Sequence, residues 1–219
     1  MQEVPLPRPQ RRTRSSELTR SMIVDAALAE FAESGYESAT TASISRRVGV
    51  TQPLVHYHFG SKRLLWEAAV NHLVERLLEN LRGSMSRLKG TGPEARLTGI
   101  CYALVDFVIA NPELPRIVNS EGARESDRLD WLVSTHFRPL VTELSRELQD
   151  ARKAGVVRDI PEAFLYFILF GATQHFFDVA PLVEKVSGYN PGNPDTAKAF
   201  ADSLVGVFLN GCGRREQTD

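Results

Sequence analysis

The sequence has little cysteine and no apolar run long enough to cross a membrane. Its two cysteines, Cys101 and Cys212, lie far apart and fit no metal or redox spacing, which indicates a reducing compartment. The longest apolar run, at residues 164–172, is far shorter than the roughly 20 residues that a bilayer requires. The N-terminus is basic but has no apolar segment after its arginines, unlike a secretory signal. We therefore expect a cytoplasmic protein that does not enter a membrane.

Motifs for catalysis and for cofactors are also missing. The sequence has no Ser-His-Asp pattern, no phosphate-binding or dinucleotide-binding glycine motif and no metal-ligand spacing. We expect no enzyme activity, no cofactor and no bound metal. Two alternatives stay open: a catalytic use of His175 with Asp178, and a thiol sensor at Cys101. Nothing near Cys101 in the sequence would make its thiol acidic.

Acidic residues are absent from one stretch of the chain. The net charge is −1 over 219 residues, which argues against a general binder of polyanions. Between Ser38 and Trp66, however, there is no Asp or Glu. The cations of this stretch are Arg46, Arg47, Lys62 and Arg63. The arginines of the N-terminal arm are Arg8, Arg11, Arg12 and Arg14. Positive charge gathered locally in a nearly neutral chain is typical of a DNA-binding surface.

After residue 16 the sequence has the pattern of an amphipathic helix. Ile23, Ala26, Ala27 and Phe31 recur at a spacing of three to four residues, and Gly35 stands where a left-handed C-cap is expected. The residues before this helix, 1–16, combine arginines with prolines and few apolar side chains, so we expect a disordered basic arm there.

Two short helices follow, each with a start and a stop signal. Thr40 can cap the helix "TASISRRV", which Gly49 closes. Thr51 can cap "QPLVHYHF", with Pro53 in its first turn, where a missing N–H costs nothing. Joined by Gly-Val-Thr, the two helices form a predicted helix-turn-helix. In such a motif the second helix enters the major groove and the first crosses the DNA backbone.

The residue types of the second short helix suit contacts with DNA. Gln52 can pair with adenine through both ends of its amide, and Pro53 with Leu54 or Val55 can touch a thymine methyl. The phosphate donors that we expect on this helix are His56, Tyr57 and His58. Ser61 can then cap the next helix, which places Lys62 beside free backbone N–H groups, in a good position for a phosphate.

Other interpretations of this cluster are weaker. His56 and His58 are two residues apart and point to different faces of a helix, so they cannot share a metal without further ligands. Phe59 is expected to be a core residue that packs against the first helix. For Tyr57 the alternative to a phosphate contact is a core position with a solvated hydroxyl.

These residues, taken in order, resemble the DNA-binding domain of the TetR family of transcriptional regulators. From Leu18 to about Leu73, the family's pattern is matched by "IVDAALAEFAESGYESATTASISRRVGVTQPLVHYHFGSKRLL". The sequence departs at His56, where the family usually has Tyr, and this leaves open whether the position contacts the backbone or reads a base. The DNA contacts that the resemblance implies are Thr40, Gln52, Pro53, His56, Tyr57, His58 and Lys62, with Arg20 or the arm adding phosphate contacts. Thr51, at the start of the second short helix, completes the predicted set.

The remainder of the chain is also predicted to be helical, which makes the fold all-α. One helical pattern leads out of the helix-turn-helix, a second stops at Asn111-Pro112, and a third runs from about 127 to 154 with a kink or restart near Pro139. We predict an arm at 1–16, a helix-turn-helix domain at 17–65 and a regulatory and dimerisation domain at 66–213. The helix that leaves the first domain is the expected lever between the two domains.

Residues 161–180 are apolar almost all the way round, whereas a surface helix has one apolar stripe. We expect this helix to be buried on two sides. With the apolar face of the last helix, at 196–211, it can form a four-helix bundle between two subunits, the dimerisation mode that the TetR resemblance implies. A homodimer is also expected because one short recognition helix reads only half of a palindromic operator.

Polar residues interrupt this apolar helix at Thr173, Gln174, His175 and Asp178. Buried polar groups need hydrogen-bonding partners. Phe170, Gln174 and Asp178 follow one another at one-turn intervals, an arrangement that suits a planar, hydrogen-bonding small molecule. The alternative, that these groups satisfy one another or cross the dimer interface, stays open.

Within the family, residues 172–188 resemble the RutR subfamily of pyrimidine-utilisation repressors, where Thr-Gln-His, Asp and Ala-Pro-x-Val-Glu-x-Val follow in the same order. In that subfamily an aromatic residue and the glutamine help hold uracil or thymine. Gln174 matches, but Phe170 stands where the subfamily has Trp, so the resemblance implies the position of a pocket and not its ligand. Further pocket candidates are Tyr102, Phe107, Trp131 and His136, each of which is alternatively a core residue.

Together these patterns predict a homodimeric repressor that binds a palindromic operator in double-stranded DNA. A planar or aromatic small-molecule effector is expected to release it. The alternative is a TetR-like DNA-binding adaptor that recruits a protein partner and has no small ligand.

Overall fold

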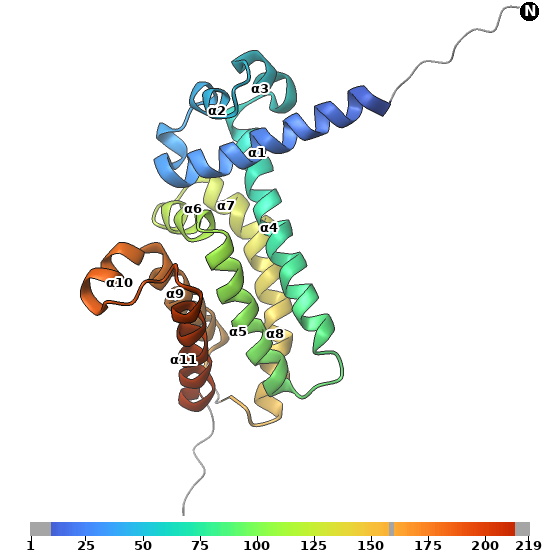
Figure 1. The fold of residues 1–219 in the computed structure, drawn as a ribbon. Helices are drawn as coiled ribbons and strands as arrows, with labels where there is room; N and C mark the ends of the chain where they lie inside the picture. The colour runs from blue at the N-terminus through green and yellow to red at the C-terminus, as the bar shows by residue number, and fades with distance from the viewer. Residues whose placement is uncertain (1–9, 158–159, 213–219) are drawn as a thin grey trace, which may run out of the picture. The chain divides into compact units, whose positions relative to one another are not determined.

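The computed structural model describes residues 10–157 and 160–212, and these form helices joined by short turns (Figure 1). No strand occurs in these two ranges, which confirms the predicted all-α class. The chain divides into two compact units, with the boundary between Leu73 and Val74, inside helix α4 (Lys62–Arg87). We call them the N-terminal unit and the C-terminal unit.

The N-terminal unit begins with α1 (Gln10–Ser38) and ends in the first part of α4. Between them lie α2 (Thr41–Val48) and α3 (Gln52–Phe59), the two short helices that the sequence predicts. The motif of α2, turn and α3 is therefore a helix-turn-helix, as expected.

Helix α1 starts earlier than the sequence suggested. Residues 10–16, predicted to be part of a disordered arm, are helical. Arginine and glutamine are good helix formers, and this segment has no proline or glycine, so nothing after Pro9 stops the helix. Residues 1–9, which include Arg8, lie outside the described residues.

Helices as short as α2 and α3 depend on packing, because their few backbone hydrogen bonds do not offset the cost of starting a helix. Ile44 of α2 is fully buried, and Val55 and Phe59 of α3 are 1% and 7% exposed. Each such burial stabilises the fold by about 1.5–3 kcal/mol. The buried residues of α1 and α4 that complete this core include Ile23, Ala27, Phe31, Leu65 and Trp66.

Two glycines end helices of this unit in conformations that other residues avoid. Gly35 has φ 72° and ψ 164°, which breaks α1 before its last turn. Gly49 has φ 76° and ψ 28°, the left-handed conformation, and its N–H bonds to the carbonyls of Arg46 and Ser45 at the end of α2. The chain can therefore turn sharply from α2 toward α3.

The two predicted N-caps behave differently. Thr40 caps α2 as predicted, with its Oγ1 accepting a hydrogen bond from the N–H of Ser43 at 2.9 Å. Thr51 precedes α3, but its side chain makes no capping bond, contrary to the prediction. The reason is local, because Pro53 has no N–H to donate and the N–H of Leu54 bonds to the backbone carbonyl of Thr51.

The C-terminal unit contains the rest of α4 and the helices that follow it. These are α5 (Pro93–Ala110), α6 (Glu113–Gly122), α7 (Asp127–Leu132), α8 (Arg138–Lys153), α9 (Glu162–Asp178), α10 (Ala180–Ser187) and α11 (Pro194–Cys212). Helix α5 is the centre of the unit, because α8, α9 and α11 all pack against it. Eight of its 18 residues are apolar and buried as a result.

The long helix predicted from 127 to 154 is interrupted just before Pro139, where a kink or restart was predicted. A π-helical turn, η1 (Val133–Phe137), lies between α7 and α8, and the N–H of Arg138 bonds five residues back to the carbonyl of Val133. Pro139 follows directly, in the first turn of α8. Its missing N–H and its ring do not fit a continuous helix, so the wider turn before it removes the conflict.

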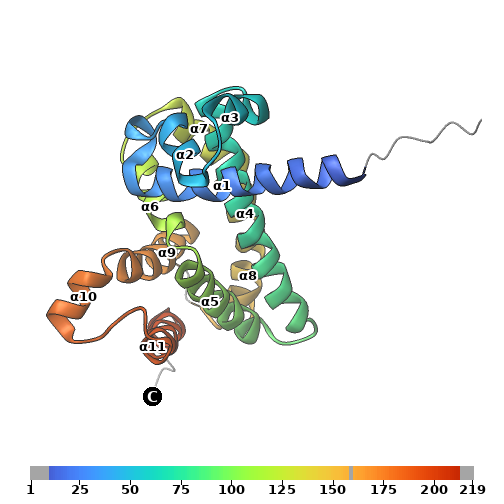
Figure 2. The same cartoon turned by 45° about the horizontal axis from the view of Figure 1, so that its top comes forward.

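The apolar segment predicted as one helix at 161–180 forms α9, and α10 follows it after a bend of 80°. Helix α10 projects to one side of α9 and α11 (Figures 1 and 2). No single helix in the described ranges has the length and hydropathy to cross a membrane. Two bent pairs, α5 with α6 and α9 with α10, would pass that test only when each pair is taken together.

Helix α9 is buried on one side within its own chain and exposed on the other. Leu165 and Leu169 are buried, whereas Phe164, Phe167 and Ile168 are 61%, 80% and 52% exposed. The expectation of burial on two sides is therefore not met inside one chain. The uncovered side is a row of large apolar side chains, of the kind that usually marks a contact surface.

Gly49→Ala should destabilise the N-terminal unit by about 1–2 kcal/mol, because a Cβ is strained in the left-handed conformation even where space is open. Gly83→Ala, in the helical interior of α4, is the matched control and should be neutral or slightly stabilising. Urea unfolding followed by circular dichroism measures both. Equal effects of the two substitutions would contradict the role of Gly49.

Candidate functional site

The exposed face of α3 carries four of the nine residues predicted to contact DNA. Gln52, Pro53, His56 and Tyr57 are exposed, and Thr51 precedes them at the exposed start of the helix. Tyr57 is 81% exposed, so the alternative of a core tyrosine is excluded. This face is polar, aromatic and free of carboxylates.

The opposite face of α3 belongs to the core. Phe59 is buried as predicted, with the guanidinium of Arg20 5.0 Å from its ring centre. Val55 is also buried and faces the core, which excludes it as the alternative to Leu54 for the predicted contact with a thymine methyl. Leu54 is half-buried, and so is His58, whose ring lies 5.3 Å from that of Tyr57.

Two side chains on the exposed face are held by neighbours. The Gln52 amide donates from Nε2 to Thr41 Oγ1 at 3.0 Å, which ties α3 to α2. His56 Nδ1 lies 3.0 Å from the carbonyl oxygen of Gly60, at the end of α3. Both contacts fix the direction of a side chain before any ligand arrives, which lowers the entropy cost of binding.

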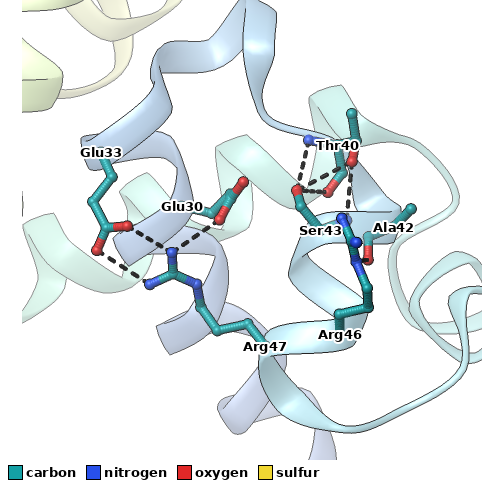
Figure 3. Close-up of polar contacts among 7 residues, drawn as sticks. All are labelled: Glu30, Glu33, Thr40, Ala42, Ser43, Arg46 and Arg47. Atoms are coloured by element: carbon teal, nitrogen blue, oxygen red, sulfur yellow. Dashed lines mark hydrogen bonds and ion pairs between the residues drawn. The ribbon is translucent and has the colours of Figure 1, made fainter.

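The predicted positive surface is smaller than the sequence suggested. Arg47 turns toward α1, where its guanidinium bonds to Glu33 at 2.6 and 3.1 Å and to Glu30 at 3.0 Å (Figure 3). The hydrogen bond to Glu33, with a smaller contribution from Glu30, raises the pKa of Arg47. Arg63 similarly pairs with Glu67 at 2.6 Å.

Arg46, one residue before Arg47, makes no ion pair with these carboxylates. Its Nε donates to the carbonyl of Ala42 at 3.4 Å, on the same helix, and the residue is exposed (Figure 3). Thr40 stands at the start of this helix, exposed, with its Oγ1 used as the cap. The end of α2 therefore has one arginine that holds the fold and one that points to solvent.

Lys62 and Ser61 form the predicted helix start. Ser61 Oγ accepts a hydrogen bond from the N–H of Leu64 at 3.1 Å, which confirms the predicted cap. The Lys62 ammonium donates to the carbonyl of Glu37 at 3.1 Å and lies 4.4 Å from the ring centre of Tyr36. Lys62 thus joins α4 to the end of α1, a structural role that the sequence pattern did not suggest.

Comparison with known proteins identifies this arrangement. Residues 23–69 match the family model described as bacterial regulatory proteins, tetR family. Over these residues the chain is a TetR-family domain. Its segment from α1 to the first part of α4 is the DNA-binding helix-turn-helix domain of that family.

The chain is similar over most of its length to proteins of two kinds. It is 24% identical over 178 residues to the HTH-type transcriptional regulator RutR of Escherichia coli, which covers 81% of this chain and 82% of RutR. It is 29% identical over 160 residues to the nucleoid occlusion factor SlmA of Vibrio cholerae, which covers 68% of this chain and 80% of SlmA. The family match and these relatives support a TetR-family transcriptional regulator.

Solved structures share the fold of this chain. A putative fatty acid metabolism regulator of Clostridium perfringens has a TM-score of 0.72 and 20% identity, covering 89% of this chain and 100% of its own. The ketosteroid transcriptional regulator of Mycobacterium tuberculosis has a TM-score of 0.69 and 20% identity, covering 90% of this chain and 95% of its own. At this identity the likeness extends to the fold alone.

The residues predicted to line a ligand pocket lie at separate places in the C-terminal unit. Phe170, Gln174 and Asp178 share one face of α9, with Gln174 buried at 8% exposed. Asp178 accepts a hydrogen bond from Asn119 Nδ2 at 3.2 Å, and its carboxylate lies 3.6 Å from Arg116 Nε of α6. The protein itself therefore supplies partners for Asp178. This agrees with the alternative interpretation, in which the polar groups of α9 are satisfied without a ligand.

The other predicted pocket residues contact different parts of the C-terminal unit. Tyr102 of α5 donates to Asp202 of α11 at 2.6 Å, and this bond raises the pKa of the phenol. Phe107 is buried in α5, and Trp131 makes an edge contact with the ring of His136 at 5.0 Å. Of the polar residues on α9, Thr173 is fully buried and donates to the carbonyl of Leu169.

His136 has an unpaired polar atom. It lies in the π-helical turn, and its Nε2 is buried without a hydrogen-bond partner. Burial lowers the pKa of His136, although the charge of Glu75 opposes this shift. A neutral imidazole with one buried, unused nitrogen is a place where a ligand or water can bind.

Burial raises the pKa of the Cys101 thiol to about 12, which argues against the thiol-sensor alternative.

A groove of about 140 Å³ lies between α4, α5 and α8, and sequence reasoning missed it. Its lining includes none of the seven predicted pocket residues. The groove is lined by Leu78, Leu81, Arg82, Met85, Ile100, Leu140, Glu143, Leu144 and Glu147. The signal in the sequence was the amphipathic pattern of α8, in which acidic residues at 143 and 147 alternate with leucines at 140 and 144.

Arg46→Gln and Arg47→Gln form a matched pair that separates the two arginine roles. Arg47→Gln should lower the free energy of unfolding by about 0.5–1 kcal/mol, since its pairs are partly exposed, and should change DNA affinity little. Arg46→Gln should leave stability unchanged and weaken DNA binding at low salt. Urea unfolding and fluorescence anisotropy with labelled duplex DNA measure the two effects. The interpretation fails if the two variants behave alike.

Proposed function

We propose that this TetR-family regulator is a homodimeric repressor that binds a palindromic operator and leaves it when a small molecule binds the C-terminal unit. The exposed polar face of α3, held in a helix-turn-helix, is the observation that carries the proposal. The N-terminal residues of such a helix meet base edges in the major groove, and its flanks meet phosphates.

The proposed division of roles follows residue type and exposure. Gln52 reads adenine and Pro53 touches a thymine methyl at the start of α3. Tyr57 and His58, with Thr40 and Thr51 at the two helix starts, donate to phosphates. Arg20 and Lys62 add positive charge at the edges of the surface, with part of each side chain already in contact with an aromatic ring.

A dimer is proposed through the uncovered side of α9. Phe164, Phe167 and Ile168 recur at helical spacing, and Val207 of α11 is 72% exposed nearby in the same bundle of helices. Exposing this many large apolar side chains is unfavourable in water. Two copies that bring α9 and α11 together as a four-helix bundle would remove them from solvent and supply two recognition helices.

Release by an effector requires that the small molecule bind one arrangement of the dimer better than the other. Three features of the C-terminal unit support such a site: the buried Gln174, the unpaired Nε2 of His136 and the apolar groove beside α8. The groove is smaller than the roughly 300 Å³ of a typical drug-sized site, so a planar effector would have to be small or widen it. Helix α4, which contains the boundary of the two units, is the proposed lever.

A second candidate is a DNA-binding adaptor that recruits a protein partner and needs no small ligand. The similarity to nucleoid occlusion factors favours it, as do the partners that Asp178 and Tyr102 find within the chain. A thermal-shift screen with pyrimidines, purines and aromatic acids separates the two candidates. A ligand at a hundred times its Kd stabilises a folded protein by about 2.7 kcal/mol, whereas an adaptor would show no shift with any of them.

Gln52→Ala should relax the base preference at one position of each half-site with a moderate loss of affinity, because one amide contact to a base is lost. Lys62→Ala should weaken binding to every sequence and reduce the slope of affinity against salt by about one. Binding to a series of single-base duplex variants at several salt concentrations measures both. If both variants lost only non-specific affinity, the assignment of base and phosphate roles would be wrong.

Phe167→Glu should produce a folded monomer with much weaker operator binding, since the side chain is 80% exposed in one chain and buried in the proposed bundle. Thr142→Glu, on the exposed side of α8, is the control that adds the same charge elsewhere in the unit. Sedimentation gives the mass of each variant and circular dichroism its helix content. A Phe167→Glu protein that stays dimeric would place the interface elsewhere.

A further inference from the structure

His56 is held in a way that fixes which of its ring nitrogens can meet DNA. Its Nδ1 lies 3.0 Å from the carbonyl oxygen of Gly60. A carbonyl oxygen only accepts hydrogen bonds, so Nδ1 must carry the proton in this contact. In the neutral ring, Nε2 is then left with a lone pair and no hydrogen, which makes it an acceptor.

The position of His56 places this acceptor on the reading face. It follows Gln52 by four residues, so the two side chains lie one turn apart on the same side of α3. Both residues are exposed, whereas Val55 and Phe59 fill the opposite side. An exposed residue in line with a base-reading glutamine faces the groove rather than the core.

An acceptor cannot bond to a phosphate oxygen, because that oxygen also only accepts. The hydrogen-bond donors that DNA offers in the major groove are the amino groups of cytosine and adenine. Guanine and thymine present acceptors there, at O6, N7 and O4, and these would repel the Nε2 lone pair. While the ring is neutral, this tautomer makes His56 a selective reader of bases and not the phosphate donor that the sequence suggested.

We propose that His56 is a specificity-determining residue whose neutral Nε2 accepts a hydrogen bond from the amino group of a cytosine or an adenine. The proposal rests on the proposed DNA-reading function of α3. Within each half-site it selects C or A, on the strand that His56 contacts, one step along the groove from the base that Gln52 reads.

The neighbouring charged groups do not take over this role. Lys62 of α4 donates to the carbonyl of Glu37 and lies against the ring of Tyr36. Arg63 pairs with Glu67, and Arg47 of α2 pairs with Glu30 and Glu33. Arg46 of α2 and His58 of α3 are the remaining basic residues of the two reading helices among the described residues.

The tautomer is tested first, on the whole wild-type protein at pH 8, above the range in which imidazoles usually carry a second proton. Long-range nitrogen–proton NMR spectra distinguish a ring protonated at Nδ1 from one protonated at Nε2, and His56→Ala identifies the signal. A ring protonated at Nδ1 supports the proposal, and one protonated at Nε2 overturns it.

The base preference is tested with duplexes in which each position of the wild-type site is changed to the other three bases. His56→Ala should make one position per half-site indifferent to sequence, with about a three- to tenfold loss of affinity for the wild-type site, the value of one hydrogen bond. His56→Arg, which only donates, should shift that position toward guanine. His58→Ala is the matched control and should weaken all duplexes alike.

The outcomes separate the inference from the proposed function. If the wild-type protein prefers no sequence, the proposed function of α3 fails, and the inference with it. If a preferred site exists and His56→Ala weakens all duplexes alike with a shallower salt dependence, His56 contacts phosphate and the inference alone is overturned. A preferred guanine or thymine at the position that His56→Ala relaxes also overturns it.

Discussion

Burial of a few side chains from α2 and α3 is the interaction on which the reading surface depends. Two helices of eight residues cannot persist alone in water, because the cost of starting each helix is not recovered over two turns. Ile44, Val55 and Phe59 supply the missing stability through the core they share with α1 and α4. The same packing decides which residues of α3 face outward, so the chemistry available to DNA follows from the core.

Charge in this part of the molecule serves the fold as well as the ligand. The stretch without acids, 38–66, looks uniformly positive in the sequence. In the structure, Arg47 pairs with carboxylates of α1, and Lys62 bonds to the end of α1, while Arg46 points to solvent. The positive surface is therefore narrower than a count of residues implies, and the proposed DNA specificity relies more on the uncharged side chains of α3.

Local signals in the sequence predicted the fold well. The helix-turn-helix followed from Thr40, Gly49 and Pro53, because caps and breakers act within a few residues of their own position. The interruption before Pro139 followed in the same way. The partners of Arg47 could not be predicted, since Glu30 and Glu33 are 17 and 14 residues away and meet it only after α1 and α2 have packed.

Predictions from composition were less reliable where one pattern fits two environments. The apolar character of α9 indicated burial but could not distinguish a core helix from one that awaits a partner, and Phe167 is exposed in the single chain. The polar residues of α9 were equally ambiguous, because their pattern fits both a ligand pocket and contacts within the protein. Asp178 proved to be paired with α6, while the unpaired Nε2 of His136 depends on a π-helical turn that the sequence pattern does not encode.

The central claim is that two copies of this chain read a symmetric DNA site through α3. Selection of bound sequences from random double-stranded DNA, with the purified wild-type protein at near-physiological salt, tests it most directly. The account predicts an inverted repeat whose half-sites are spaced by about one helical turn of DNA or a multiple of it. Recovery of no motif, with only weak binding that salt abolishes, would contradict it.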